Sequence, residues 1–214
     1  MKMMIIGPMN SGKGTYASRI AQRMGIPHIS TGQIFRENIA AKTELGKKVE
    51  IFLNKGVLVP DDITLSVAIE RISKPDCKKG FIFDGFPRSL EQAKQFDKIT
   101  KFDIVIYLDV PREVLIERTS SRRTCKKCGE IFNTIYFKPK KEGICDKCGG
   151  NLVQRADETS EAINKRLEEY EKSTKPLIDY YEKQGTLKRI VFDDPRAPPE
   201  ENTRFILNAL GVKK

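Results

Sequence analysis

The sequence predicts an α/β fold in which helices flank a doubly wound, parallel, five-stranded sheet. Short apolar segments with the composition of buried strands alternate with segments whose apolar residues recur at helical spacing. The first apolar segment runs directly into a glycine-rich loop that opens a helix, as expected for the first strand–loop–helix unit of such a sheet. At 214 residues, the chain can bury a core of this kind as one domain with insertions.

The individual elements follow from the same patterns. The predicted strands cover residues 2–6, 27–29, 81–84, 104–108 and 187–191. Residues 12–24 are predicted to be helical, because Ala17, Ile20, Ala21 and Met24 fall on one helix face. The other predicted helices cover residues 63–72, 90–96, 112–120, 160–182 and 202–210.

Two segments interrupt this alternation. Residues 30–59 are predicted to be helical with no strand of their own, and residues 122–156 contain four cysteines and little helical periodicity. We expect both to be insertions on a core formed by residues 1–29, 60–121 and 157–214. Insertions in these positions are candidates for moving covers over a substrate.

Composition restricts the possible functions only in part. The formal net charge of +10 fits either a solvated basic surface or a partner rich in phosphate. No apolar run approaches the roughly 20 residues that span a bilayer. The opening residues MKMMIIG are too short for a secretory signal, so we expect a cytoplasmic protein without a membrane partner.

The first loop has the spacing of a phosphate-binding P-loop. Gly7, Gly12 and Lys13 form the pattern Gly-x4-Gly-Lys between a strand and a helix. The glycines let backbone N–H groups converge on phosphate oxygens, and the lysine adds a positive charge. Gly14 follows the lysine and Thr15 comes next, so the hydroxyl that usually binds Mg²⁺ is displaced by one residue. We therefore expect Mg²⁺ to be held mainly by the nucleotide.

The cysteines predict a metal site in the second insertion. Cys125, Cys128, Cys145 and Cys148 form two Cys-x-x-Cys pairs separated by 16 residues, a spacing typical of tetrahedral Zn²⁺ sites. Four thiolates leave no position for a substrate, so the ion is expected to be structural. Iron in the same four-cysteine arrangement remains an alternative. Cys77 stands apart from these pairs.

Three further motifs give the chain a family resemblance. Together with GKGT, the segments STGQIFR (30–36), VLVPDD (57–62) and DGFPRSLEQA (84–93) closely resemble the adenylate kinase family of nucleoside monophosphate kinases, in its zinc-lid branch. The resemblance implies that residues 30–59 are the NMP-binding insertion and that residues 122–156 are a zinc-binding lid. It implies an AMP site formed by Thr31, Arg36, Val57, Leu58, Val59, Gly85, Arg88, Gln92, Arg155 and Arg166. The amide of Gln92 suits the adenine edge because it can donate and accept together.

The resemblance also implies a donor site and the groups that assist transfer. The ATP-binding residues would be Asn10, Ser11, Gly12, Lys13, Gly14, Thr15, Arg118, Arg122, Ile131, Phe132 and Asp194. The catalytic residues would be Lys13, Asp84, Arg88, Arg122, Arg155 and Arg166. Asp84 would orient waters on Mg²⁺, and the cationic groups would stabilise charge on the transferred phosphoryl group. The single histidine, His28, is interpreted as structural.

The chain departs from the family pattern at four positions. Met9 and Asn10 replace a proline and a glycine in the loop, and Gln33 replaces an aspartate after Thr-Gly. Asp194 aligns with a glycine whose backbone meets the ATP adenine, which leaves the preferred donor base open.

We therefore predict reversible, Mg²⁺-dependent phosphoryl transfer from ATP to AMP by a monomer that binds ATP, AMP and ADP. Transfer from GTP, or to another nucleoside monophosphate, is the nearest alternative. A nucleic-acid-binding zinc ribbon is a remote one, because aromatic residues are not interleaved with Lys and Arg as stacking platforms.

Overall fold

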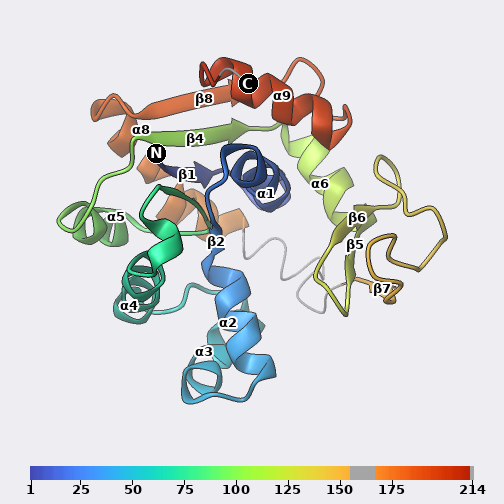
Figure 1. Cartoon of the computed structure of the whole chain (residues 1–214), viewed down its shortest axis with the longest axis horizontal. Helices are drawn as coiled ribbons and strands as arrows, with labels where there is room; N and C mark the ends of the chain where they lie inside the picture. The colour runs from blue at the N-terminus through green and yellow to red at the C-terminus, as the bar shows by residue number, and fades with distance from the viewer. Residues whose placement is uncertain (155–166, 213–214) are drawn as a thin grey trace.

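The computed structural model describes residues 1–154 and 167–212, and a parallel five-stranded sheet forms its centre (Figure 1). The strand order is β2-β3-β1-β4-β8, and every neighbouring pair is parallel. The strands are β1 (Lys2–Ile6), β2 (His28–Ser30), β3 (Phe81–Asp84), β4 (Ile104–Asp109) and β8 (Leu187–Val191). The predicted doubly wound α/β sheet is confirmed, and no predicted strand of the sheet is displaced by more than one residue.

The sheet register brings the ends of three strands together. In the central strand, Ile5 pairs with Asp84 of β3, and Ile6 pairs with Tyr107 of β4. The carboxyl ends of β1, β3 and β4 therefore lie side by side at one edge of the sheet. In open α/β sheets, this is the edge at which ligands bind.

Helices cover both faces of the sheet. They are α1 (Lys13–Met24), α4 (Asp61–Ile72), α5 (Leu90–Asp97), α6 (Arg112–Ser121), α8 (Pro176–Lys183) and α9 (Pro199–Ala209), with a short 3₁₀ turn η1 (Pro75–Cys77). On one face, α1, α6 and α9 bury side chains such as Ile20, Leu115 and Ile206. On the other face, α4, α5 and α8 pack on an aromatic cluster that includes Phe83 and Phe96. Alternate residues of each strand supply the two cores, as the strand period of two requires.

Both interrupting segments project from the sheet (Figure 1). The first contains α2 (Thr31–Ala40) and α3 (Glu44–Lys55), which pack on a separate small core around Phe35 and Val49. The second contains β5 (Arg122–Cys125), β6 (Ile131–Asn133) and β7 (Leu152–Val153), which form an antiparallel sheet in the order β6-β5-β7. The second sheet buries little more than Phe132 and its cysteines, so it has a very small apolar core.

The structure differs from the prediction in the long helix expected at residues 160–182. Its first part, residues 160–166, lies outside the described residues. The described part contains a π-helical turn, η2 (Tyr170–Thr174), directly before α8. The N–H of Lys175 donates to the carbonyl of Tyr170 at 2.8 Å, a spacing of five residues. Pro176 has no N–H to continue the ladder, which explains why the regular helix restarts there.

Within residues 1–154 and 167–212, no helix is both long and apolar enough to cross a membrane.

Candidate active site

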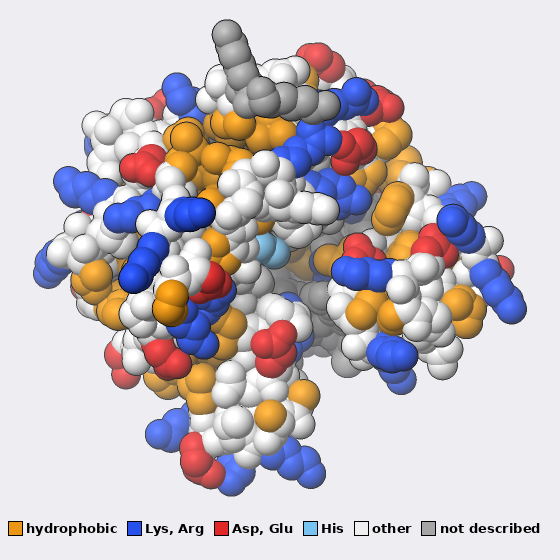
Figure 2. All heavy atoms as spheres, in the orientation of Figure 1, with side chains coloured by type: hydrophobic (Ala, Val, Ile, Leu, Met, Phe, Trp, Pro, Cys, Tyr) orange, Lys and Arg blue, Asp and Glu red, His pale blue; other side chains and the backbone are white. Residues whose placement is uncertain are grey.

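A cleft of about 1010 Å³ opens at the carboxyl edge of the sheet, between the core and the two projecting segments. Its walls come from the β1–α1 loop, α2, the chain after α3, the β3–α5 connection, α6 and the β5–β6 hairpin. Figure 2 shows this hollow, with the imidazole of the chain's one histidine at its edge. Segments far apart in the sequence therefore meet around one space.

The glycines of the β1–α1 loop are required by close packing. A Cβ on Gly7 would lie 2.8 Å from the Oγ of Ser11, and a Cβ on Gly12 would lie 2.5 Å from the ring of Tyr16. Gly12 also has a φ of +99°, which disfavours any side chain. The loop thus curls tightly into the N-terminus of α1, where backbone N–H groups and the helix dipole favour an anion.

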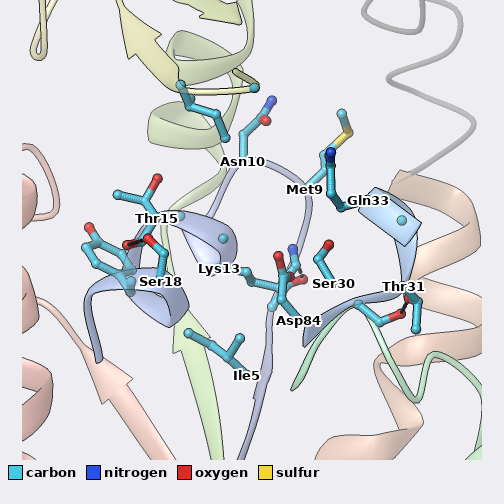
Figure 3. Close-up of a pocket in the computed structure, with 18 of the residues that line it drawn as sticks. Ile5, Met9, Asn10, Lys13, Thr15, Ser18, Ser30, Thr31, Gln33 and Asp84 are labelled. Atoms are coloured by element: carbon cyan, nitrogen blue, oxygen red, sulfur yellow. Dashed lines mark hydrogen bonds between the residues drawn. The ribbon is translucent and has the colours of Figure 1, made fainter. Parts of the chain in front are cut away.

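Lys13, the first residue of α1, folds back over this loop. Its Nζ donates to the carbonyl oxygens of Gly7 at 2.8 Å and Pro8 at 2.7 Å. These bonds hold the ammonium group over the loop, at the floor of the cleft (Figure 3). A phosphate bound by the loop would therefore meet a positive charge already in place.

Asn10 connects the loop to the start of the second projecting segment. Its φ of +59° is left-handed, a conformation that asparagine tolerates better than most residues. The Nη1 of Arg122 donates to its Oδ1 at 2.6 Å, and its Nδ2 donates to the Oγ1 of Thr119. A glycine at this position could adopt the same backbone but could make neither contact. The departure at Asn10 is thus accommodated, and it adds a link between the loop and β5.

Arg118 makes a second link from α6. Its Nη1 donates to the carbonyl of Ser11 at 3.0 Å, and its Nη2 donates to the carbonyl of Pro195. The guanidinium group therefore lies between the phosphate-binding loop and the connection that precedes α9. Three separate chain segments are held together by one side chain.

Asp84, the last residue of β3, faces Lys13 across the floor of the cleft (Figure 3). The side chain is only 16% exposed, and its Oδ2 lies 3.7 Å from the Nε2 of His28. Burial alone would raise the pKa of Asp84, but the neighbouring His28 and the charges of Lys13 and Arg88 outweigh it and hold that pKa below its ordinary value. The carboxylate is thus kept ionised among cationic groups. His28 therefore helps to keep the Asp84 carboxylate ionised.

The opposite wall carries a second set of cationic and polar groups. The Oγ1 of Thr31 donates to the carbonyl of Gly85 at 2.9 Å, and the Nε of Arg88 donates to the same carbonyl at 3.0 Å. Gly85 has a φ of +84°, and a Cβ there would lie 2.9 Å from the Nη2 of Arg88. The positive φ disfavours other residues at this position, and the guanidinium group of Arg88 packs close to the glycine.

Gln33 supports the other arginine of this wall. The Nε and Nη2 of Arg36 donate to the Oε1 of Gln33 at 3.3 and 3.2 Å. An amide at this position therefore retains a hydrogen-bond acceptor for the arginine, without the negative charge of the aspartate that the family pattern has there. Arg36 is thereby held at the rim of the cleft.

The four paired cysteines form a cluster in the second projecting segment. All four Sγ atoms lie within 4.8 Å of one another. A tetrahedral Zn²⁺ with bonds of about 2.3 Å requires sulfur atoms about 3.8 Å apart; Cys125 and Cys148 are 3.4 Å apart, and Cys128 and Cys145 are 3.6 Å apart. A Cβ on Gly150 would lie only 2.9 Å from Cys125 Sγ. A glycine at position 150 therefore leaves space for the sulfur cluster. The donor set and its spacing fit a tetrahedral metal ion.

The cleft gathers most residues predicted for the site. Those that line it are Asn10, Gly12, Lys13, Gly14, Thr15, Thr31, Arg36, Val57, Leu58, Val59, Asp84, Gly85, Arg88, Gln92, Arg118, Arg122, Ile131 and Phe132. Ser11, which belongs to the β1–α1 loop, is fully buried. Asp194 is exposed and is not part of the lining, whereas Pro195, Arg196 and Ala197 are. Arg155 and Arg166 lie outside the described residues.

Sequence reasoning missed two supporting residues. The Nη2 of Arg196 lies 3.0 Å from Glu117 Oε2, and its Nε donates to the Tyr136 hydroxyl at 3.2 Å, which joins the connection before α9 to α6 and to the second projecting segment. The carboxylate of Asp61 contacts Gln92. The available signals were an arginine two residues after Asp194 and an acidic pair directly after VLVP.

Comparison with known proteins gives the same family throughout. The sequence model of the family described as adenylate kinase matches residues 5–186. A protein named adenylate kinase from Caldicellulosiruptor saccharolyticus is 47% identical over 218 residues, which cover 100% of both chains. Adenylate kinases from Thermosipho africanus and Archaeoglobus fulgidus are 50% and 47% identical; each covers 87% of this chain, and 90% and 88% of its own.

The environment of Asp84 leads to a pH-dependent prediction. Replacing His28 with leucine removes a group that favours the ionised carboxylate, so the pKa of Asp84 should rise toward or above 3.8. A carboxyl group whose pKa is lower in the folded protein than in the unfolded chain stabilises the fold when the pH is above the unfolded-state pKa. This stability is lost as the pH falls through the folded-state pKa. The wild type should therefore lose more stability than the variant below about pH 4. Carbon-13 titration of the Asp84 carboxyl group measures its pKa in each protein. Superimposable titration curves for the wild type and the variant would refute the prediction.

Proposed function

The chain belongs to the adenylate kinase family, and we propose that it transfers the γ-phosphoryl group of MgATP reversibly to AMP, giving two ADP. Its class, a nucleoside monophosphate kinase phosphotransferase, follows from the family match and from the named relatives. One observation carries the specific assignment. A single cleft has a phosphate-binding loop with Lys13 on one wall and an arginine-rich wall with Gln92 on the other. Two nucleotides can therefore meet in it with their phosphates facing.

The donor nucleotide is assigned to the wall formed by the loop. Its phosphates would accept hydrogen bonds from backbone N–H groups of residues 10–15 and from Lys13. Arg118 and Arg122 lie against this loop and can neutralise the remaining charge. Ile131 and Phe132, on the β5–β6 hairpin, line the same side of the cleft and would contact the nucleotide. Asp194 would act only through its backbone, next to the lining residues 195–197.

The acceptor nucleotide is assigned to the opposite wall. The planar guanidinium groups of Arg36 and Arg88 suit the phosphate of AMP. Val57, Leu58 and Val59 offer backbone and apolar contacts to the base, and Thr31 and Gly85 complete the wall. Gln92 reads the adenine edge. Together these groups place the AMP phosphate so that it faces the loop.

The chemistry needs positioning and charge stabilisation rather than a protein nucleophile. An oxygen of the AMP phosphate attacks the γ-phosphorus, the bond to the bridging oxygen breaks, and ADP leaves with the electron pair. Because that phosphate is already ionised, no base has to remove a proton. Lys13, Arg88 and Arg122, together with Arg155 and Arg166, would stabilise the charge on the transferred oxygens. Asp84 would orient water on the Mg²⁺ that arrives with ATP.

The cysteine cluster is assigned to a structural Zn²⁺. Four thiolates close the coordination shell, so the ion has no open position for a substrate. It would supply the rigidity that the very small apolar core of this segment lacks. Thiols that hold a metal fit a reducing compartment, which supports a cytoplasmic location. Iron in the same shell is the alternative ion.

We further infer that residues 30–59 and 122–156 are the two movable covers on a core formed by residues 1–29, 60–121 and 157–214. Each projects from the sheet and has its own small core, so each can swing as a unit over its nucleotide. A monomer with only nucleotide partners suits this movement. The net charge of +10 is then accounted for in part by the arginines and the lysine that face phosphate.

The assignment of donor and acceptor predicts a specific pattern of turnover. A coupled assay with every pair of ATP, GTP, CTP or UTP and AMP, GMP, CMP or UMP should give the highest kcat/KM with AMP as acceptor. ATP is expected to be the preferred donor. A preference for GTP at saturating AMP would change the donor assignment alone. Absence of turnover with AMP and every triphosphate, together with tight RNA binding, would contradict the proposed function.

Removal of the metal should destabilise the lid without deleting a catalytic group. Chelation, or the variant Cys128→Ser, is expected to lower the Tm by more than about 5 °C, because the segment loses the bonds that hold it folded. Cys77→Ala is the matched control, because Cys77 is a buried thiol outside the cluster and should leave metal content unchanged. Elemental analysis gives the stoichiometry, and an absorption spectrum distinguishes colourless Zn²⁺ from iron thiolate. An unchanged Tm after complete removal would rule out a structural role.

A further inference from the structure

The side-chain amide of Gln92 is held by two partners of opposite and fixed polarity. Its Nε2 donates to Asp61 Oδ1 at 2.6 Å, and its Oε1 accepts from the backbone N–H of Arg88 at 2.8 Å. A carboxylate can only accept, and a backbone N–H can only donate. The two ends of an amide look nearly alike, but here the partners leave one orientation that satisfies both bonds.

Asp61 is itself fixed from two sides. It is the first residue of α4, and its second oxygen, Oδ2, accepts from the Oγ of Ser89 at 2.9 Å. That same Oγ caps α5 by accepting from the backbone N–H of Gln92 at 3.1 Å. Asp61, Ser89 and Gln92 therefore form a closed ring of hydrogen bonds between the starts of two helices. The carboxylate cannot turn away without breaking both bonds.

The ring determines which groups the amide still offers to the cleft. Gln92 lines the cleft although it is only 1% exposed. One N–H and one lone pair are used by Asp61 and Arg88, which leaves one N–H donor and one carbonyl lone pair. Adenine complements this pair, since its N1 accepts and its N6 amino group donates. A 6-oxopurine such as hypoxanthine presents the opposite polarity, with an acceptor at O6 and a donor at N1.

We propose that Asp61 is a positioning residue that sets the acceptor-base preference of this enzyme, by locking the Gln92 amide in the orientation that selects a 6-aminopurine over a 6-oxopurine. This proposal rests on the assignment of AMP to the wall that contains Gln92. Asp61 is not part of the lining, so it acts through the amide rather than on the nucleotide. In the wild type, a flipped amide would place its Oε1 against a carboxylate and its NH₂ against an N–H. Rejection of the wrong base then carries the penalty of unmade buried hydrogen bonds.

The test compares AMP with inosine monophosphate, which differs in the polarity of this edge. In Asp61→Asn, residue 61 can donate as well as accept, so a flipped Gln92 amide loses one partner instead of two. The ratio of kcat/KM for AMP to that for inosine monophosphate is expected to fall about tenfold or more, with KM for ATP unchanged. Asp62→Asn is the matched control. It makes the same charge change one residue along α4, at an exposed position, and should keep the wild-type ratio.

Two results would overturn the proposed role of Asp61, and a third would refute the proposed function. An Asp61→Asn enzyme that keeps the wild-type ratio while it turns over AMP overturns this proposal and leaves the proposed function intact. Equal loss of the ratio in Asp62→Asn also overturns it, because the effect would then be one of charge alone. A wild type that accepts no AMP refutes the proposed function instead.

A measurement on the wild type guards against a variant that fails to fold. Nitrogen-15 NMR should show the Gln92 side-chain amide with one Nε2 proton shifted strongly downfield by the carboxylate and protected from exchange. Two Nε2 protons with the ordinary shifts and fast exchange of a solvated glutamine amide would mean that the carboxylate does not hold the amide, which would overturn the proposal without any substitution.

Discussion

The site depends on the meeting of Lys13 and Asp84 at the carboxyl edge of the sheet. Parallel pairing of Ile5 with Asp84 fixes the two strand ends next to each other, and the tight glycine loop returns Lys13 to the same place. An ammonium and a carboxylate here give a floor that attracts phosphate and can still orient the water around a cation.

Side chains near the starts of helices and strands connect this floor to the two walls of the cleft. Asn10 joins the loop to the first residue of β5, and Asp61 joins the start of α4 to the start of α5. In both hydrogen bonds, one partner can only donate or only accept. The bonds therefore fix the orientation of the Arg122 guanidinium group and of the Gln92 amide, as well as their positions. Each wall of the cleft thus contains a side chain that is held in place by a hydrogen bond to a residue distant in the sequence.

The sequence predicted the sheet, the loop and the cysteine cluster because each depends on short-range pattern. Apolar runs, Gly-x4-Gly-Lys spacing and Cys-x-x-Cys pairs are local, and the strands and the cysteine cluster lie where these patterns indicate. The link from Asn10 to Arg122 spans 112 residues, and the bond from Asp61 to Gln92 spans 31. Contacts of this kind depend on how the helices pack, which no local pattern encodes. The π-helical turn before Pro176 was missed for a related reason, since the apolar periodicity continues across it.

We propose that Lys13 supplies positive charge to the transferred phosphoryl group and contributes little to AMP binding. The steady-state kinetics of Lys13→Met, together with AMP affinity measured by calorimetry, test this role. We expect kcat to fall by at least about 10²- to 10³-fold, because one preorganised charge is removed from the transition state. The Kd for AMP should change by less than about threefold, since AMP is assigned to the opposite wall. A variant that retains kcat within tenfold of the wild type, or that loses AMP binding as well, would contradict it.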